Sequence, residues 1–119
     1  MNALLQNNPA FWGALLGASG VALGAFGAHG LRAVLSPEFL AIFETAVRYQ
    51  LLHALLLVAL GSRVRGWPPV ALLVGTLVFS GSLYALVGTG IRLFGAVTPI
   101  GGVLLLAGWG WLALQGRRE

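Results

Sequence analysis

The residues that could carry chemistry are few, and the clearest of them lie close together. Glu44 and Arg48 are four residues apart with the acid first, which is the favoured order for an ion pair on a helix. In a low-dielectric environment, either charge without a partner would be strongly destabilising. The spacing therefore predicts a structural ion pair between Glu44 and Arg48. It also leaves a functional interpretation open, in which Glu44 binds a cation, a proton or a polar headgroup.

Two histidines extend the set of candidates. His53 lies about 180° around the same helix from Glu44, so these two side chains cannot converge on one small site. His29 closes an earlier apolar segment and could meet His53, but two histidines without nearby carboxylates make a poor metal site. We predict that each histidine is hydrogen-bonded, and we expect no metal site and no cofactor.

Other polar residues fall at the same predicted depth. Gln50 shares a segment with Glu44, whereas Tyr84 follows Ser80 and Ser82 in a later segment. The two serines and Tyr84 suit hydrogen bonds between helices better than catalysis. The hypothesis of a binding site includes six residues, which are Glu44, Arg48, His53, His29, Gln50 and Tyr84.

Four long apolar stretches carry these residues. Hydrophobic residues make up 58% of the chain and charged residues 8%, against about 45–50% and about 25% in soluble domains. Residues 1–31, 66–91 and 93–116 contain no charged side chain, and about 20 apolar residues cross a bilayer as one helix. The chain is therefore predicted to be all-α, a polytopic membrane protein folded as a compact bundle of four transmembrane helices.

Cap and proline signals predict the helix boundaries. Ser36 and Pro37 suit the cap and first position of one helix, and Thr98 and Pro99 suit those of another. Breaks that contain glycine separate the segments. We predict a single membrane domain, residues 1–119, with helices at about 10–28, 37–61, 69–87 and 99–114.

The first predicted helix carries a stripe of glycines. Their spacings of four, three, four and three place them within roughly 80° of the helix surface. In lipid, glycine lets another backbone approach closely. The stripe predicts helix packing, either inside one bundle or between protomers, through Gly13, Gly17, Gly20, Gly24 and Gly27.

Arginine counts predict the orientation in the membrane. With both termini in the cytoplasm, four arginines lie on the cytoplasmic side and two lie on the other side, with Arg48 close to them. The cytoplasmic arginines are Arg63, Arg65, Arg117 and Arg118, and the others are Arg32 and Arg92. All four tryptophans then map to the cytoplasmic half, where an aromatic belt would anchor the protein. The candidate binding residues map to the non-cytoplasmic half.

Composition and motifs exclude several functional classes. The chain has no cysteine, which excludes disulfides and thiol catalysis. It has no phosphate-cradling loop, nucleophile elbow or metalloprotease helix, so we expect that it is not an enzyme. Its seven basic residues are all arginine and give a net charge of +4. In a membrane protein this excess indicates topology and contact with anionic lipid, and no nucleic-acid partner is expected.

Four strings of the sequence match one known family. They are GAFGAHGL at 24–31, FETAVRYQ at 43–50 with HAL at 53–55, FSGSLY at 79–84 and TPIGG at 98–102. Together they resemble the YgdD-like family of small bacterial inner-membrane proteins, a domain of unknown function with eukaryotic transmembrane relatives. The resemblance covers residues 13–112. It implies a four-helix protein of the bacterial cytoplasmic (inner) membrane, and it carries over no catalytic residue.

These patterns favour a non-enzymatic binding or scaffold protein. Its non-cytoplasmic half would contact membrane lipid, a small ligand or a partner membrane protein, and a homo-oligomer is a further prediction. The alternative is a small oligomeric transporter or channel. A pore requires a polar stripe through the full depth of the membrane, whereas the polar residues of this chain map to one half only.

Overall fold

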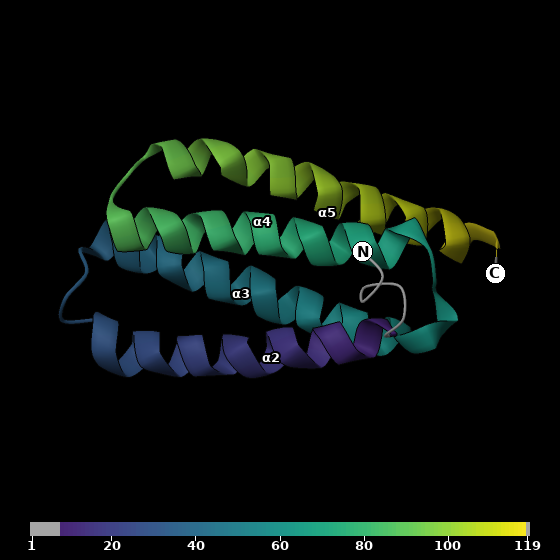
Figure 1. Ribbon diagram of the computed structural model, residues 1–119, viewed down its shortest axis with the longest axis horizontal. Coiled ribbons are helices and arrows are strands. Elements are labelled where there is room, and N and C mark those ends of the chain that lie inside the picture. The colour runs from purple at the N-terminus through teal and green to yellow at the C-terminus, as the bar shows by residue number, and fades with distance from the viewer. Residues whose placement is uncertain (1–7, 119) are drawn as a thin grey trace.

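Four long helices form the part of the chain described by the computed structural model, residues 8–118 (Figure 1). Each helix is long and apolar enough to cross a membrane, so the predicted all-α membrane fold is confirmed. The predicted domain also included residues 1–7 and Glu119, which lie outside the described residues. The helices are α2 (Pro9–Phe26), α3 (Pro37–Leu60), α4 (Trp67–Thr89) and α5 (Leu93–Arg118), with a π-helical turn η1 (Gly27–Leu31) after α2 and a 3-10 turn η2 (Gly61–Arg63) after α3.

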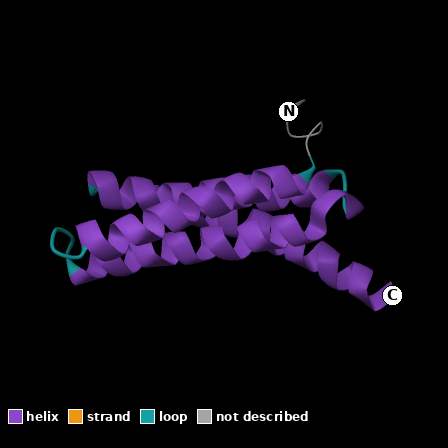
Figure 2. Ribbon diagram, turned by 90° about the horizontal axis from the view of Figure 1, so that it is seen from below, coloured by secondary structure: helices purple, strands orange, loops and turns teal. Residues whose placement is uncertain are grey.

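The helices pack in the order of the sequence. α2 packs against α3, α3 against α4, and α4 against α5, so α2 and α5 lie at opposite edges of the view in Figure 1. The C-terminal turns of α5 diverge from the other helices (Figure 2). The four helices run the length of the molecule in alternating directions, so α2 begins and α5 ends at the same end. The α2–α3 and α4–α5 connections lie at the other end (Figure 1).

Side-chain caps begin the first two helices. The Asn8 side chain accepts a hydrogen bond from the Ala10 N–H at 2.8 Å, and Ser36 Oγ accepts one from the Phe39 N–H at 3.1 Å. A proline follows each cap at the first helical position, where its missing N–H costs nothing. The predicted start of α3 at Ser36 and Pro37 is confirmed.

The predicted start of the fourth helix at Pro99 is wrong, because α5 begins at Leu93 and Pro99 lies inside it. Gly90 has a positive φ of 74° and ends α4, so the chain reverses within a few residues and a helix can begin at once. A bilayer favours helix over open backbone, since lipid supplies no hydrogen bonds, and it tolerates proline within a spanning helix. The preference of a spanning segment for continuous helix is therefore stronger here than the preference of proline for the first helical position.

The glycine stripe of α2 faces α3 of the same chain. A Cβ at Gly13 would lie 2.7 Å from the Ala54 carbonyl oxygen, and a Cβ at Gly20 would lie 2.8 Å from Leu51 Cδ2. Further along, a Cβ at Gly24 would lie 3.3 Å from a Val47 methyl carbon. The stripe therefore serves packing inside the bundle, which was one of the two interpretations that the sequence left open.

A second glycine contact joins α4 to α5, and the stripe of the first helix gave no indication of it. A Cβ at Gly101 would lie 2.8 Å from the Gly75 carbonyl oxygen and also 2.8 Å from Phe79 Cα. A Cβ at Gly108 would lie 2.5 Å from Leu72 Cδ2. Gly101 and Gly108 are seven residues apart and so share one helix face, which brings the two backbones together.

Replacing Gly13 by alanine is expected to lower the free energy of unfolding by about 1–3 kcal/mol, because the added Cβ would push against the Ala54 carbonyl. Gly17→Ala is the matched control on the same helix. Its Cβ would lie 3.8 Å from Ala54 Cβ, so this variant should be neutral or more stable. Thermal unfolding in detergent, followed by circular dichroism, measures both. An unchanged midpoint for Gly13→Ala would contradict the close packing.

Two adjacent glycines give a sharper comparison on α5. Gly101→Ala should lower the unfolding midpoint, because its Cβ would meet only backbone atoms of α4, which cannot rotate away. Gly102→Ala should not lower it, since no atom of another helix lies within 4 Å of its Cβ. The same unfolding measurement tests the pair, and equal loss of stability in both variants would refute the assigned face of α5.

Candidate functional site

Gln50 is the centre of a hydrogen-bonded network that joins three helices. Its side chain is buried, and its Nε2 donates to the Leu16 carbonyl at 2.9 Å and to Ser19 Oγ at 2.8 Å, both on α2. Its Oε1 accepts from the Tyr84 hydroxyl on α4 at 2.7 Å. Gln50 and Tyr84, both candidate binding residues, therefore meet each other, and their polar atoms are engaged within the protein.

The serines of α4 form the predicted hydrogen bonds between helices. Ser80 Oγ donates to the Ala46 carbonyl of α3 at 2.7 Å. Ser82 Oγ lies 2.5 Å from Thr98 Oγ1 of α5. Both serines are buried, and a buried hydroxyl is costly without a partner. These two bonds hold α4 to the helices on either side of it.

His53 is buried and hydrogen-bonded through both ring nitrogens. Its Nε2 lies 3.0 Å from Trp109 Nε1 of α5, and its Nδ1 lies 2.7 Å from the Tyr49 carbonyl oxygen. Because an indole N–H can only donate, Nε2 is the acceptor. The proton then resides on Nδ1 and points to Tyr49. This arrangement occupies both nitrogens, as the prediction of a hydrogen-bonded histidine requires.

The structure does not bring His29 to His53. His29 is exposed on η1, whereas His53 is buried on α3 beside Trp109 of α5. Within residues 8–118, no three histidine or acidic side chains gather closely enough to hold a metal ion.

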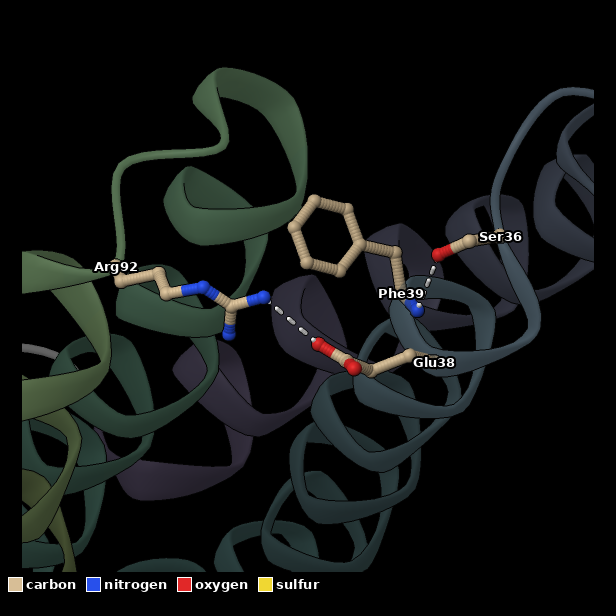
Figure 3. Close-up of polar contacts among 4 residues, drawn as sticks. All are labelled: Ser36, Glu38, Phe39 and Arg92. Carbon is tan, nitrogen blue, oxygen red and sulfur yellow. Dashed lines mark hydrogen bonds and ion pairs between the residues drawn. The ribbon is translucent and has the colours of Figure 1, made fainter.

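Glu44 and Arg48 do not form the predicted ion pair. Among the described residues, the one ion pair joins Arg92 to Glu38, at 3.2 Å (Figure 3). Glu44 and Arg48 are both exposed on α3. An exposed pair of this spacing gains only about 0.2–0.5 kcal/mol, which does not fix two long side chains in one geometry. The prediction failed because these side chains project out of the bundle, away from the buried network.

Both residues instead line an open cavity of about 360 Å³ between α2, η1 and α3, at the end of the molecule away from the first residue of α2. The apolar part of its wall includes Phe43, Val47 and Leu51 of α3, and the remaining wall comes from the glycine-rich end of α2. The complete lining is Gly24, Gly27, Ala28, Arg32, Leu40, Phe43, Glu44, Val47, Arg48 and Leu51.

Two of the six predicted binding residues line the cavity, and the other four lie outside it. Glu44 and Arg48 line it, whereas Gln50, His53 and Tyr84 belong to the buried network, and His29 is not part of the lining. Sequence reasoning missed Arg32 as a lining residue. The sequence does place Arg32 at the same predicted end of the protein as Arg48, which is the one indication of its position.

Sequence reasoning also missed Ser19 and Trp109 as hydrogen-bond partners. Helical periodicity places Ser19 about 100° from Gly20, to one side of the glycine stripe, so the stripe alone does not indicate its contact with Gln50. Trp109 lies in α5, and no local pattern relates it to His53. Their hydrogen bond depends on how α5 packs against the rest of the bundle.

Comparison with known proteins identifies close relatives. Residues 23–102 match a family described as a protein of unknown function (DUF423). The chain is 47% identical over 103 residues to a UPF0382 membrane protein of Staphylococcus haemolyticus, covering 82% of this chain and 84% of that protein. It is 42% identical over 96 residues to the UPF0382 inner membrane protein YgdD of Escherichia coli K12, covering 75% and 73%. No solved structure matches the chain.

The Gln50 network yields a prediction for the two tyrosines of the chain. Tyr84→Phe should lower the free energy of unfolding by about 1 kcal/mol, because the buried Gln50 Oε1 would lose its donor. Tyr49→Phe is the matched control. It retains the ring stacked on Phe79 at 4.4 Å, and its own hydroxyl makes no hydrogen bond with the described residues.

A double-mutant cycle tests that assignment. The cost of Tyr84→Phe should shrink when Gln50 is replaced by leucine, because the acceptor is then gone. Equal costs in the two backgrounds, measured by reversible unfolding in detergent, would show that the Tyr84 hydroxyl stabilises the fold by some other contact.

Proposed function

The chain belongs to the DUF423 (UPF0382) family of membrane proteins, and we propose that it binds one amphipathic membrane lipid, without catalysis, in the cavity between η1 and α3. The observation that carries the proposal is the composition of the cavity wall. Its floor is apolar, and three charged side chains, Arg32, Glu44 and Arg48, border it. A lipid is the common membrane component whose two ends match such a wall.

The size of the cavity supports a lipid headgroup with the adjoining part of an acyl chain. Ligand-binding cavities commonly measure about 300–1,000 Å³, and this one is about 360 Å³. It is open to the outside of the bundle, since Ala28, Glu44 and Arg48 are exposed. The rest of a bound lipid can therefore remain in the bilayer.

The depth of the cavity supports the same ligand. The helix formed by α3 and η2 has 27 residues, or about 40 Å at 1.5 Å per residue. A hydrocarbon core is about 30 Å thick, so the first turns of α3 extend into the headgroup region. Glu44 lies two turns into α3 and Arg48 three turns in. Long arginine side chains reach outward to the polar interface, so in this proposal the Arg48 guanidinium extends toward the headgroups.

The proposal includes an orientation. Both termini would be cytoplasmic, because Arg63, Arg65 and Arg117 lie at the end of the bundle where α2 begins and α5 ends, and cytoplasmic loops favour arginine. The cavity would then take its lipid from the non-cytoplasmic leaflet. A second cavity, about 140 Å³ and lined by Trp12 and Arg65, lies at the cytoplasmic end in this orientation and has one charged residue in its wall.

A binding role suits the chemistry of the bundle better than catalysis or transport. The buried polar side chains of the described region are Gln50, His53, Thr76, Ser80 and Ser82. Each makes a hydrogen bond inside the protein. A polar group that already has a hydrogen-bond partner inside the bundle is not free to conduct an ion or take up a substrate proton.

Filling the cavity should abolish lipid binding. Ala28→Trp places an indole in the opening, where Ala28 lines the cavity and is exposed. Ala22→Trp is the matched control, because Ala22 is also an exposed alanine, in the preceding helix α2, and is not part of the lining. Native mass spectrometry of protein released from a mild detergent should find a lipid mass on wild type and Ala22→Trp, and none on Ala28→Trp.

Two results would contradict the proposal. The same lipid mass on Ala28→Trp would show that lipid binds elsewhere on the surface. A second protein mass retained in place of lipid, and lost in Ala28→Trp, would assign the cavity to another copy of the chain or to a partner membrane protein.

A further inference from the structure

We infer that the cavity selects a lipid whose headgroup carries both a phosphate and a primary ammonium group. This inference rests on the proposed function and narrows its ligand to one chemical class. It follows from the charges in the cavity wall, which are of both signs. Two arginines, Arg32 and Arg48, line the same cavity as Glu44.

The two arginines supply the phosphate half of the recognition. A guanidinium group offers a planar set of N–H donors that matches a phosphate, and such charge-assisted bonds are roughly twice as strong as neutral ones. Arg32 lies just beyond η1 and Arg48 lies in α3, so they approach the cavity from two different segments. A phosphate between them would be held from both sides.

Glu44 is a negative charge in the cavity lining, and a purely anionic lipid has no group that could pair with it. Within the described part of the chain, its carboxylate takes part in neither an ion pair nor a hydrogen bond. A carboxylate near the hydrocarbon boundary is costly without a cation beside it. Arginine cannot provide that cation and also bind a phosphate with the same N–H groups. A ligand that brings its own ammonium group resolves both requirements.

The other acidic side chain at this end of the protein shows the contrast. Glu38, in the first turn of α3, is already paired with Arg92 from the α4–α5 connection (Figure 3). Arg92 and Glu38 are not in the cavity lining. The chain thus neutralises one carboxylate with its own arginine and leaves the other facing the cavity.

The chemistry of the ammonium group decides which headgroups fit. A primary ammonium has three N–H donors for the Glu44 carboxylate, as a lysine side chain has. A trimethylated ammonium has a charge but no N–H to donate. A glycerol headgroup carries the same phosphate but has no cation to neutralise Glu44. Phosphatidylethanolamine is therefore the expected probe lipid, ahead of phosphatidylcholine and phosphatidylglycerol.

The experiment is a competition between defined lipids. Delipidated wild-type protein is mixed in detergent with equal amounts of phosphatidylethanolamine, phosphatidylglycerol and phosphatidylcholine that share the same acyl chains, and the bound masses are counted by native mass spectrometry. Wild type should retain phosphatidylethanolamine about tenfold more than either competitor, the difference expected of one charge-assisted hydrogen bond. Glu44→Gln should remove that preference, and Arg48→Gln should weaken retention of all three lipids.

Matched controls separate the cavity from the general charge at this end of the bundle. Glu38→Gln and Arg92→Gln remove the same charges from residues outside the cavity lining, and both should leave the preference unchanged. Thermal unfolding of every variant in the same detergent identifies any that has lost its fold. Should Glu44→Gln unfold, Glu44→Asp replaces it, and a reduced preference with the shorter acid gives the same answer.

The outcomes distinguish this inference from the proposed function. Lipid retention by wild type with no preference for phosphatidylethanolamine, or a preference that survives in Glu44→Gln, would overturn the headgroup assignment and leave lipid binding standing. Retention of no lipid at all would overturn both. A last measurement adds soluble glycerophosphoethanolamine, which is the headgroup without acyl chains. If it displaces the lipid at equal concentration, the apolar floor contributes nothing to binding and the ligand is a free headgroup.

Discussion

The close approach of α2 to α3 is the constraint on which the other features of this protein depend. Without side chains on the facing surface of α2, the two backbones come close enough for Ala54 and Val47 to contact the glycines directly. At Gly20 the same gap admits the side chain of Gln50, whose amide nitrogen would lie 3.4 Å from a Cβ at that position. The amide can therefore reach the Leu16 carbonyl of the opposite helix. In lipid, where helix association gains little from the hydrophobic effect, such packing and hydrogen bonding supply the attraction.

The glycine stripe continues to the cavity. Gly24 and Gly27 line the cavity together with Phe43 and Val47 of α3. A Cβ at Gly27 would collide with the Phe43 ring, and one at Gly24 would lie 3.3 Å from a Val47 methyl carbon, so these glycines let the two sides of the wall pack directly on each other. Arg32, Glu44 and Arg48 complete the charged part of the lining. Structure and proposed binding site share one stripe of small residues.

The polar residues of the chain divide into two groups according to their partners. Those that point into the bundle, such as Gln50, His53 and Ser80, bond to other helices and make the packing specific. Those that point outward, Glu44 and Arg48, are exposed and have the cavity beside them. This division follows from the cost of an unpaired polar group in an apolar medium. A group with partners inside the protein is structural, and a charge without one needs solvent, a headgroup or a ligand.

The sequence by itself determined the features that depend on local pattern. Hydropathy defined four spans, caps at Ser36 and Pro37 located the start of α3, and helical periodicity gathered the five glycines of α2 on one face. Only the tertiary structure decided which side chains meet. It pairs Gln50 with Tyr84, Ser19 and Leu16, and His53 with Trp109. It also leaves Glu44 and Arg48 without an ion pair and begins α5 before Pro99. The physical reason is that hydropathy and periodicity are properties of one helix, whereas a contact depends on the rotation and depth of its neighbour. Those are fixed only when all four helices pack together.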